Sequence, residues 1–137
     1  MSIIPEQHLD ILQSTALAYI ATIGPKGEPQ VSPVWFGWDG IQLFFSMNKV
    51  RQKHRNLLRE PRIAVAIADP ANPYRSLEIR GVVRIDDDPT KHFANVLSQK
   101  YLHRATTPEE NPPDEERVVI VVEPTHVLVF PFQAEKK

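Results

Sequence analysis

Residues 17–47 read LAYIATIGPKGEPQVSPVWFGWDGIQLFFSM and decide the fold, because two turns divide them into three short apolar runs. The glycines of Gly24-Pro25-Lys26-Gly27 flank a proline, as in a hairpin turn, and their spacing differs from that of a phosphate-binding Walker loop. Asp39-Gly40 is the strongest local hairpin signal, since such a pair suits a tight turn. The stretch therefore predicts three antiparallel strands in a meander, at residues 17–23, 29–38 and 41–47.

The rest of the chain adds strands and short helices to this meander. Further strands are predicted where apolar residues alternate or run together: residues 63–68, 76–86 and 117–130, the last interrupted at Pro124. Helices are predicted to start near Pro5, Val50 and Asp88. Most connections between strands are too short for the crossovers of a parallel sheet. We therefore expect a mainly β protein with some helix, in the form of a small antiparallel barrel whose closure removes exposed edges.

Two local features stand out within this pattern. Gly81 lies inside the strand predicted at residues 76–86, where an isolated glycine indicates a β-bulge. Residues 104–116 are polar and rich in proline, and they carry five acids between Glu109 and Glu116. This composition predicts a loop that forms a mobile rim or lid.

Several cations lie where the third predicted strand ends and a helix begins, in the segment Ser46-Met47-Asn48-Lys49-Val50-Arg51-Gln52-Lys53. The first turn of a helix has unpaired N–H groups and a positive dipole end, so this junction is typical of an anion site. Helical spacing puts Val50, His54, Leu57 and Leu58 on an inward face, with Arg51 and Lys53 on its two flanks. The alternative is a solvated basic face, to which we assign Arg55 and Arg59.

Composition narrows the classes of function. The 137 residues suit one domain, residues 1–137, and a net charge of −1 with a pI near 6.5 argues against a nucleic-acid binder. The chain has no cysteine and its five histidines lack metal-ligand spacing, so no metal site is predicted. No apolar run spans a membrane and no signal peptide is recognisable, which predicts a cytoplasmic protein. Neither a Ser-His-Asp signature nor a carboxylate pair is found, so no catalytic side chain is predicted.

Several segments, taken in order along the chain, resemble one family. They are residues 18–23 (AYIATI), 27–36 (GEPQVSPVWF), 51–57 (RQKHRNL), 61–65 (PRIAV), 69–70 (DP), 72–74 (NPY), 78–81 (EIRG) and 116–120 (ERVVI). Together they resemble the flavin- and deazaflavin-binding split β-barrel family related to pyridoxamine 5'-phosphate oxidase. The resemblance is closest to its small deazaflavin-dependent oxidoreductases and extends over nearly the whole chain.

This resemblance implies a six-stranded antiparallel split β-barrel flanked by short helices, which forms a homodimer with cofactor sites at the subunit interface. The implied cofactor-binding residues are Arg51, Lys53 and Ser46 at the phosphate, Gln30 and Ser32 beside the ring system, and Tyr74 from the other subunit. Trp35 and Trp38 are candidates for stacking near a ring, although aromatic residues on barrel strands are more often core or dimer contacts.

The implied function is that of an oxidoreductase that transfers a hydride between a deazaflavin, coenzyme F420, and a small organic substrate. FMN is the alternative cofactor, and the residues alone favour neither. In both cases the cofactor supplies the hydride chemistry while the protein binds, orients and excludes water. Two other functions stay open: an FMN-dependent flavoprotein reductase or oxidase, and a flavin- or haem-binding protein without catalysis.

Overall fold

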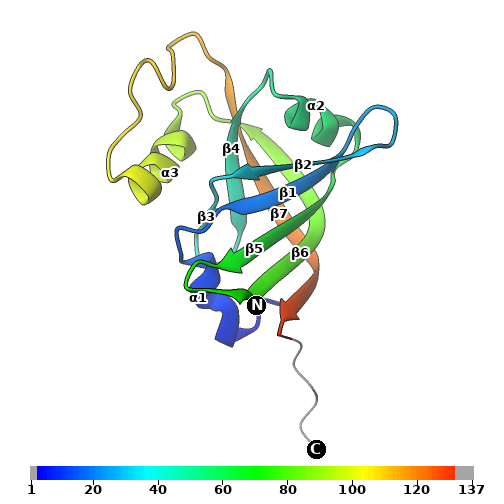
Figure 1. Cartoon of the computed structure of the whole chain (residues 1–137). Helices are drawn as coiled ribbons and strands as arrows, with labels where there is room; N and C mark the ends of the chain where they lie inside the picture. Colours follow the sequence, from blue (N-terminus) through cyan, green and yellow to red (C-terminus); the bar gives the residue numbers. More distant parts are fainter. Residues whose placement is uncertain (1–2, 132–137) are drawn as a thin grey trace, which may run out of the picture.

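The computed structural model describes residues 3–131, whose strands form one antiparallel sheet that curls on itself (Figure 1). The strands are β1 (Ala18–Ile23), β2 (Pro29–Val34), β3 (Gly37–Trp38), β4 (Leu43–Asn48), β5 (Arg62–Asp69), β6 (Asn72–Asp87) and β7 (Arg117–Phe130). Their order across the sheet is β2-β1-β5-β6-β7-β4-β3, and every neighbouring pair is antiparallel. The predicted split barrel is confirmed, with seven strands in this part of the chain instead of six.

The additional strand arises because residues 29–38 form two strands at opposite edges of the sheet. β2 pairs with β1, whereas β3 pairs with β4. As an edge strand, β2 tolerates Pro29 and Pro33, whose missing N–H groups would interrupt a central strand. The chain then leaves this edge and passes through the core, where Phe36 is fully buried, before it starts β3. The prediction of one continuous strand at 29–38 was therefore wrong.

Short helices lie at the ends and the side of the curled sheet (Figure 1). They are η1 (Glu6–His8), α1 (Leu9–Leu12), α2 (Gln52–Arg59) and α3 (His92–Leu102). Helix α1 contacts β5, α2 contacts β1, and α3 contacts β3 and β4. No helix within residues 3–131 is long and apolar enough to cross a membrane.

Two helices begin later than the sequence predicts. Arg51 is extended and occupies the N-cap of α2, so Val50 precedes the helix and is exposed. Leu58, also predicted to face inward, is exposed, while His54 and Leu57 are buried as expected. Helix α3 begins at His92, and the buried Asp88 carboxylate accepts hydrogen bonds from its first N–H groups across the turn. The N-cap residue is Lys91, so the predicted helix start near Asp88 was too early, although the Asp88 carboxylate still accepts from free N–H groups of the first turn.

Strand β7 is buried on both faces over its first half. Val118, Ile120 and Val122 belong to the main core inside the curled sheet. Val119 and Val121 point the other way and pack with Phe44 of β4 and Leu97 of α3, in a second apolar cluster. This double burial explains the continuous apolar run at 118–122, because alternate residues of a strand face opposite sides.

A bulge bends the pairing of β6 with β7. The register shifts between Arg80 and Gly81, and Gly81 lies opposite Pro124, so the bulge predicted at Gly81 is confirmed. Strand β7 continues through Pro124, where an interruption was predicted. The irregular ladder accommodates the missing N–H of Pro124.

Gly81→Ala should destabilise the protein by about 1–3 kcal/mol, the range for overpacking at a rigid site. A Cβ at this position would collide with the backbone oxygen of Glu123, which cannot move without breaking the ladder. Gly24→Ala is the matched control, because the nearest atoms that its Cβ would meet belong to the side chains of Glu28 and Gln30 and not to the backbone. Urea unfolding measures both losses, and equal losses would contradict the explanation.

Candidate functional site

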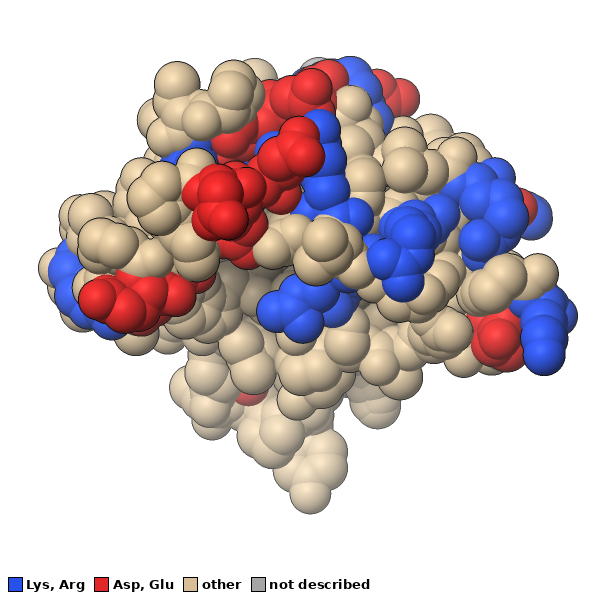
Figure 2. All heavy atoms as spheres, turned by 90° about the horizontal axis from the view of Figure 1, so that it is seen from above, with Lys and Arg blue, Asp and Glu red and all other residues tan. Residues whose placement is uncertain are grey.

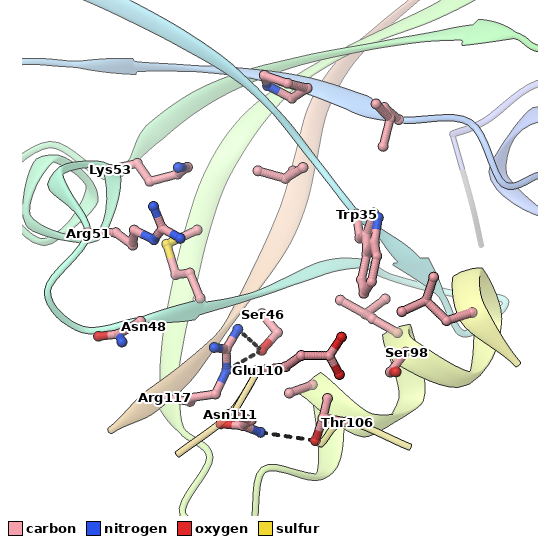
Figure 3. A pocket seen from close by; sticks show the side chains of 17 residues that line it. Trp35, Ser46, Asn48, Arg51, Lys53, Ser98, Thr106, Glu110, Asn111 and Arg117 are labelled. Atoms are coloured by element: carbon pink, nitrogen blue, oxygen red, sulfur yellow. Dashed lines mark hydrogen bonds between the residues drawn. The ribbon is translucent and has the colours of Figure 1, made fainter. Parts of the chain in front are cut away.

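A cleft of about 620 Å³ opens between the start of α2, strand β4, helix α3 and the loop that precedes β7 (Figure 3). The residues that line it are Leu17, Pro33, Val34, Trp35, Ser46, Met47, Asn48, Arg51, Lys53, Ala94, Leu97, Ser98, Leu102, Thr106, Glu110, Asn111 and Arg117. Of the predicted cofactor-binding residues, Arg51, Lys53 and Ser46 lie together in this cleft. Gln30, Ser32 and Tyr74 do not line it.

Arg51 and Lys53 form a pair of uncompensated cations at one end of the cleft (Figure 3). Neither side chain has an ion-pair or hydrogen-bond partner among residues 3–131, whereas the neighbouring Lys49 pairs with Asp87 at 2.9 Å. Burial, and then the charge of Arg51, lowers the pKa of Lys53. Two adjacent positive charges without a carboxylate favour an anionic ligand, which would relieve their repulsion.

The other basic side chains of α2 are already occupied. Arg55 donates hydrogen bonds to the Val50 carbonyl and to Gln52, and Arg59 donates to the Ile23 carbonyl at 2.6 Å. Neither arginine lines the cleft. Both side chains are exposed, which agrees with the prediction that Arg55 and Arg59 belong to a solvated basic face.

Ser46 lies in the middle of the cleft and is oriented by Arg117. The Nε and Nη2 groups of Arg117 donate to Ser46 Oγ at 3.2 and 3.1 Å, while Nη1 donates to Glu115 at 3.3 Å. Because Arg117 takes up the acceptor positions of Ser46 Oγ, the serine hydroxyl is left to donate to a ligand. Sequence reasoning missed Arg117, since its proximity to Ser46 depends on the pairing of β4 with β7.

Gln30 and Asn56 take part in a buried network behind α2. The amide of Asn56 donates to Gln30 Oε1 at 2.8 Å and to Thr22 Oγ1 at 3.0 Å. Asn56 is fully buried and fixes the helix on β1 and β2. Gln30 therefore holds the helix and does not line this cleft, and its contact with a cofactor stays a prediction.

Tyr74 lies at the start of β6, with 79% of its surface exposed, and Ser32 is half-buried on the edge strand β2. The neighbouring Arg75 is held by Asp10 and Asp69 of the same chain, which raises the pKa of its guanidinium. Contact of Ser32 or Tyr74 with a cofactor stays a prediction, and for Tyr74 it requires a second subunit.

Trp35 provides a flat and rigid wall of the cleft. Its ring stacks on Tyr101 of α3, with centroids 5.0 Å apart and planes 4° from parallel. Tyr101 in turn donates to the Ala16 carbonyl at 2.6 Å and accepts from the Phe36 N–H. Stacking of this kind holds the indole in one orientation, so it can present a fixed surface to a ligand.

The loop between α3 and β7 covers the far side of the cleft. Arg104 binds both carboxylate oxygens of Glu110 at 2.8 Å, and Lys91 donates to the carbonyls of Asn111 and Pro112. The sequence predicted a mobile rim or lid here, and in the structure Asn111 of this loop is buried and Glu110 lines the cleft. Seen from above, acidic and basic side chains lie next to each other on this face (Figure 2). The loop therefore contributes polar side chains to the wall of the cleft.

Comparison with known proteins decides the family. A sequence model described as pyridoxamine 5'-phosphate oxidase matches residues 4–130. The chain belongs to this family. A comparison with curated proteins found no match.

Solved structures agree with membership of the pyridoxamine 5'-phosphate oxidase family. A protein described as an F420 reductase shares 42% identity, with a TM-score of 0.81, and the match covers 90% of this chain and 98% of that one. A putative pyridoxamine 5'-phosphate oxidase from Listeria innocua shares 21% identity at a TM-score of 0.70, covering 91% and 96%. A conserved hypothetical protein from Mycobacterium tuberculosis shares 19% identity at a TM-score of 0.75, covering 98% and 94%. The last two comparisons speak for the fold alone.

Lys100 supports the aromatic wall and should make stability depend on pH. Its Nζ donates to the Phe36 carbonyl at 2.8 Å and lies 3.7 Å from the Phe36 ring centroid, while burial lowers the pKa of Lys100 to about 8. Between this value and the ordinary 10.5, the unfolded chain binds more protons than the folded chain, so stability rises with pH.

We therefore expect the free energy of unfolding of the wild type, relative to Lys100→Met, to rise by about 1–2 kcal/mol from pH 7.5 to 11, after allowance for partial solvent screening. Lys26→Met, in an exposed turn, is the control and should leave this pH dependence unchanged. A pH-independent difference between wild type and Lys100→Met would contradict the role assigned to burial.

Proposed function

We propose that the protein is an oxidoreductase that transfers a hydride between a deazaflavin, coenzyme F420, and a small organic substrate. The observation that carries the proposal is the pair Arg51 and Lys53, which lacks an acidic partner among residues 3–131 and faces a cleft with the flat ring of Trp35. A phosphate-bearing ligand with a planar ring system matches both features.

The choice between two cofactors rests on the relatives. The 42% identity to a protein described as an F420 reductase favours the deazaflavin. Membership of the pyridoxamine 5'-phosphate oxidase family makes FMN the second candidate. Both cofactors carry a phosphate, so the cation pair suits either one.

The residues of the cleft fit such a cofactor in separate roles. Arg51 and Lys53 would hold the phosphate, and the Ser46 hydroxyl, oriented by Arg117, would donate a hydrogen bond to the ligand. The bound cofactor supplies the hydride chemistry, while Trp35 and the loop at 104–116 exclude water from the cleft. We assign no proton transfer to any side chain.

Arg51→Ala and Lys53→Ala should each weaken binding of the cofactor by about 1.5–3 kcal/mol, the range for a charge-assisted hydrogen bond. Titration of the purified protein with coenzyme F420 and with FMN, followed by absorbance and fluorescence, measures the affinity for each. Arg59→Ala removes the same charge from the same helix outside the cleft and should bind as the wild type does. Unchanged affinity in both test variants would reject the phosphate site.

We further propose that the protein is a homodimer whose cofactor sites lie at the subunit interface. The outer face of the β1–β2 hairpin supports this proposal, because Tyr19 and Val31 lie there with 50% and 70% of their surfaces exposed. Exposed apolar side chains that share a face are typical of an interaction surface.

Sedimentation should therefore give about twice the chain mass of 15.6 kDa. Val31→Glu should shift the protein toward monomer and weaken cofactor binding together, because a buried charge opposes association. Lys26→Glu, at the exposed turn of the same hairpin, controls for the change in charge. A wild-type monomer that binds the cofactor at full affinity would exclude the dimeric site.

A further inference from the structure

Two buried oxygen atoms without hydrogen-bond partners belong to residues on the wall of the cleft. Ser98 Oγ, on α3, and Asn111 Oδ1, on the following loop, accept no hydrogen bond from any described residue, and Ser98 Oγ donates none. Ser98 is 0% exposed and Asn111 is 7% exposed. Figure 3 shows both residues with Glu110 on one side of the cleft, across from Arg51 and Lys53.

Neither oxygen has a structural role that accounts for its position. A serine inside a helix commonly donates to a carbonyl one turn earlier, but Ser98 has no such bond. The Asn111 Nδ2 group donates to Thr106 Oγ1 at 3.4 Å, and Thr106 is itself anchored by two bonds to Asn95 Oδ1. These bonds direct Asn111 Oδ1 away from Thr106. Buried polar atoms nearly always have a partner. Within residues 3–131 the others without one belong to His8 and Glu115, and only Ser98 and Asn111 also line the cleft, so these two oxygens point to a missing ligand there.

The hydrogen-bonding groups on this wall of the cleft determine which ligands can bind there. Asn111 Oδ1 can only accept hydrogen bonds, and Ser98 Oγ can accept or donate. Hydrogen bonds from Arg104 and from the Thr107 N–H lower the pKa of Glu110 to about 2, so the third group is a carboxylate. Its Oε2 accepts from Arg104 Nη2 alone and can accept one more hydrogen bond. Around these acceptors lie the apolar side chains of Ala94, Leu97 and Leu102.

We propose that Ser98, Asn111 and Glu110 form a substrate subsite that binds the N–H or O–H donors of a small, otherwise apolar molecule, such as a ring bearing a carboxamide or a hydroxyl group. The inference rests on the proposed function in one respect: a cofactor held at Arg51 and Lys53 would lie across the cleft from the bound group. The hydroxylated chain of the cofactor carries O–H donors too, and the experiment separates these two sources.

Benzamide and methyl benzoate form a suitable pair of probes, because they share a ring and a carbonyl but only benzamide has N–H donors. Each is titrated into ¹⁵N-labelled protein without cofactor, and the side-chain amide signal of Asn111 is followed by NMR. We expect benzamide to shift this signal and to bind at least about fivefold more tightly than methyl benzoate, as one additional hydrogen bond requires. Equal binding of the two probes would overturn the subsite.

Ser98→Ala tests the contribution of one oxygen. The preference for benzamide should fall to less than about twofold, whereas Ser76→Ala, on strand β6 outside the cleft, should retain it. Removal of an oxygen that has no partner should not lower the melting temperature. A clear drop in melting temperature would show that Ser98 Oγ is bonded within the protein and would count against the proposal.

A second titration of benzamide, with saturating coenzyme F420 or FMN, identifies the source of the donors. Binding of benzamide beside the cofactor supports a substrate subsite, whereas its displacement assigns the oxygens to the cofactor and overturns the proposal. If neither cofactor binds but benzamide is still preferred, the proposed function fails and the subsite stands. If a cofactor binds and the probes are not distinguished, the subsite fails and the proposed function stands.

Discussion

The double burial of β7 is the constraint on which the rest of the molecule depends. Its alternate side chains fill the core inside the curled sheet and the second cluster beneath α3, so one strand holds both layers together. The same strand pairs with β4 and with β6 and thereby joins the two halves of the barrel. Arg117, its first residue, consequently reaches Ser46 in the cleft. The position of β7 therefore determines both the packing of the two apolar clusters and the contact of Arg117 with Ser46.

Local signals in the sequence predicted a large part of the fold. The turns at Gly24-Pro25-Lys26-Gly27 and Asp39-Gly40 and the bulge at Gly81 depend on neighbouring residues, and the structure has all three. The separation of residues 29–38 into β2 and β3 depends on which edge each part joins, and this is a non-local choice. The start of α2 was misjudged because Arg51 is extended, which delays the helix and leaves Val50 outside it.

The residues of the candidate site also differ in whether a local pattern in the sequence reveals them. Arg51 and Lys53 were found from the sequence, because a strand-to-helix junction with two cations is a pattern within one short segment. Arg117 is separated from Ser46 by 71 residues, and nothing in either segment indicates the other. The acceptors Ser98 and Asn111 are ordinary polar residues in a sequence. Only their burial without partners makes them informative, and burial is a property of the folded chain.

The buried amide of Asn56 has a consequence for how the site responds to its surroundings. It ties α2, which carries the cation pair, to Thr22 and Gln30 on the β1–β2 hairpin. The outer face of that hairpin carries Tyr19 and Val31, so the exposed apolar surface and the cation pair are connected through the same hairpin. If association and anion binding stabilise the same position of the hairpin, thermodynamic linkage requires that each strengthens the other by the same factor. Ligand affinity would in that case increase with protein concentration, and dilution would release the ligand.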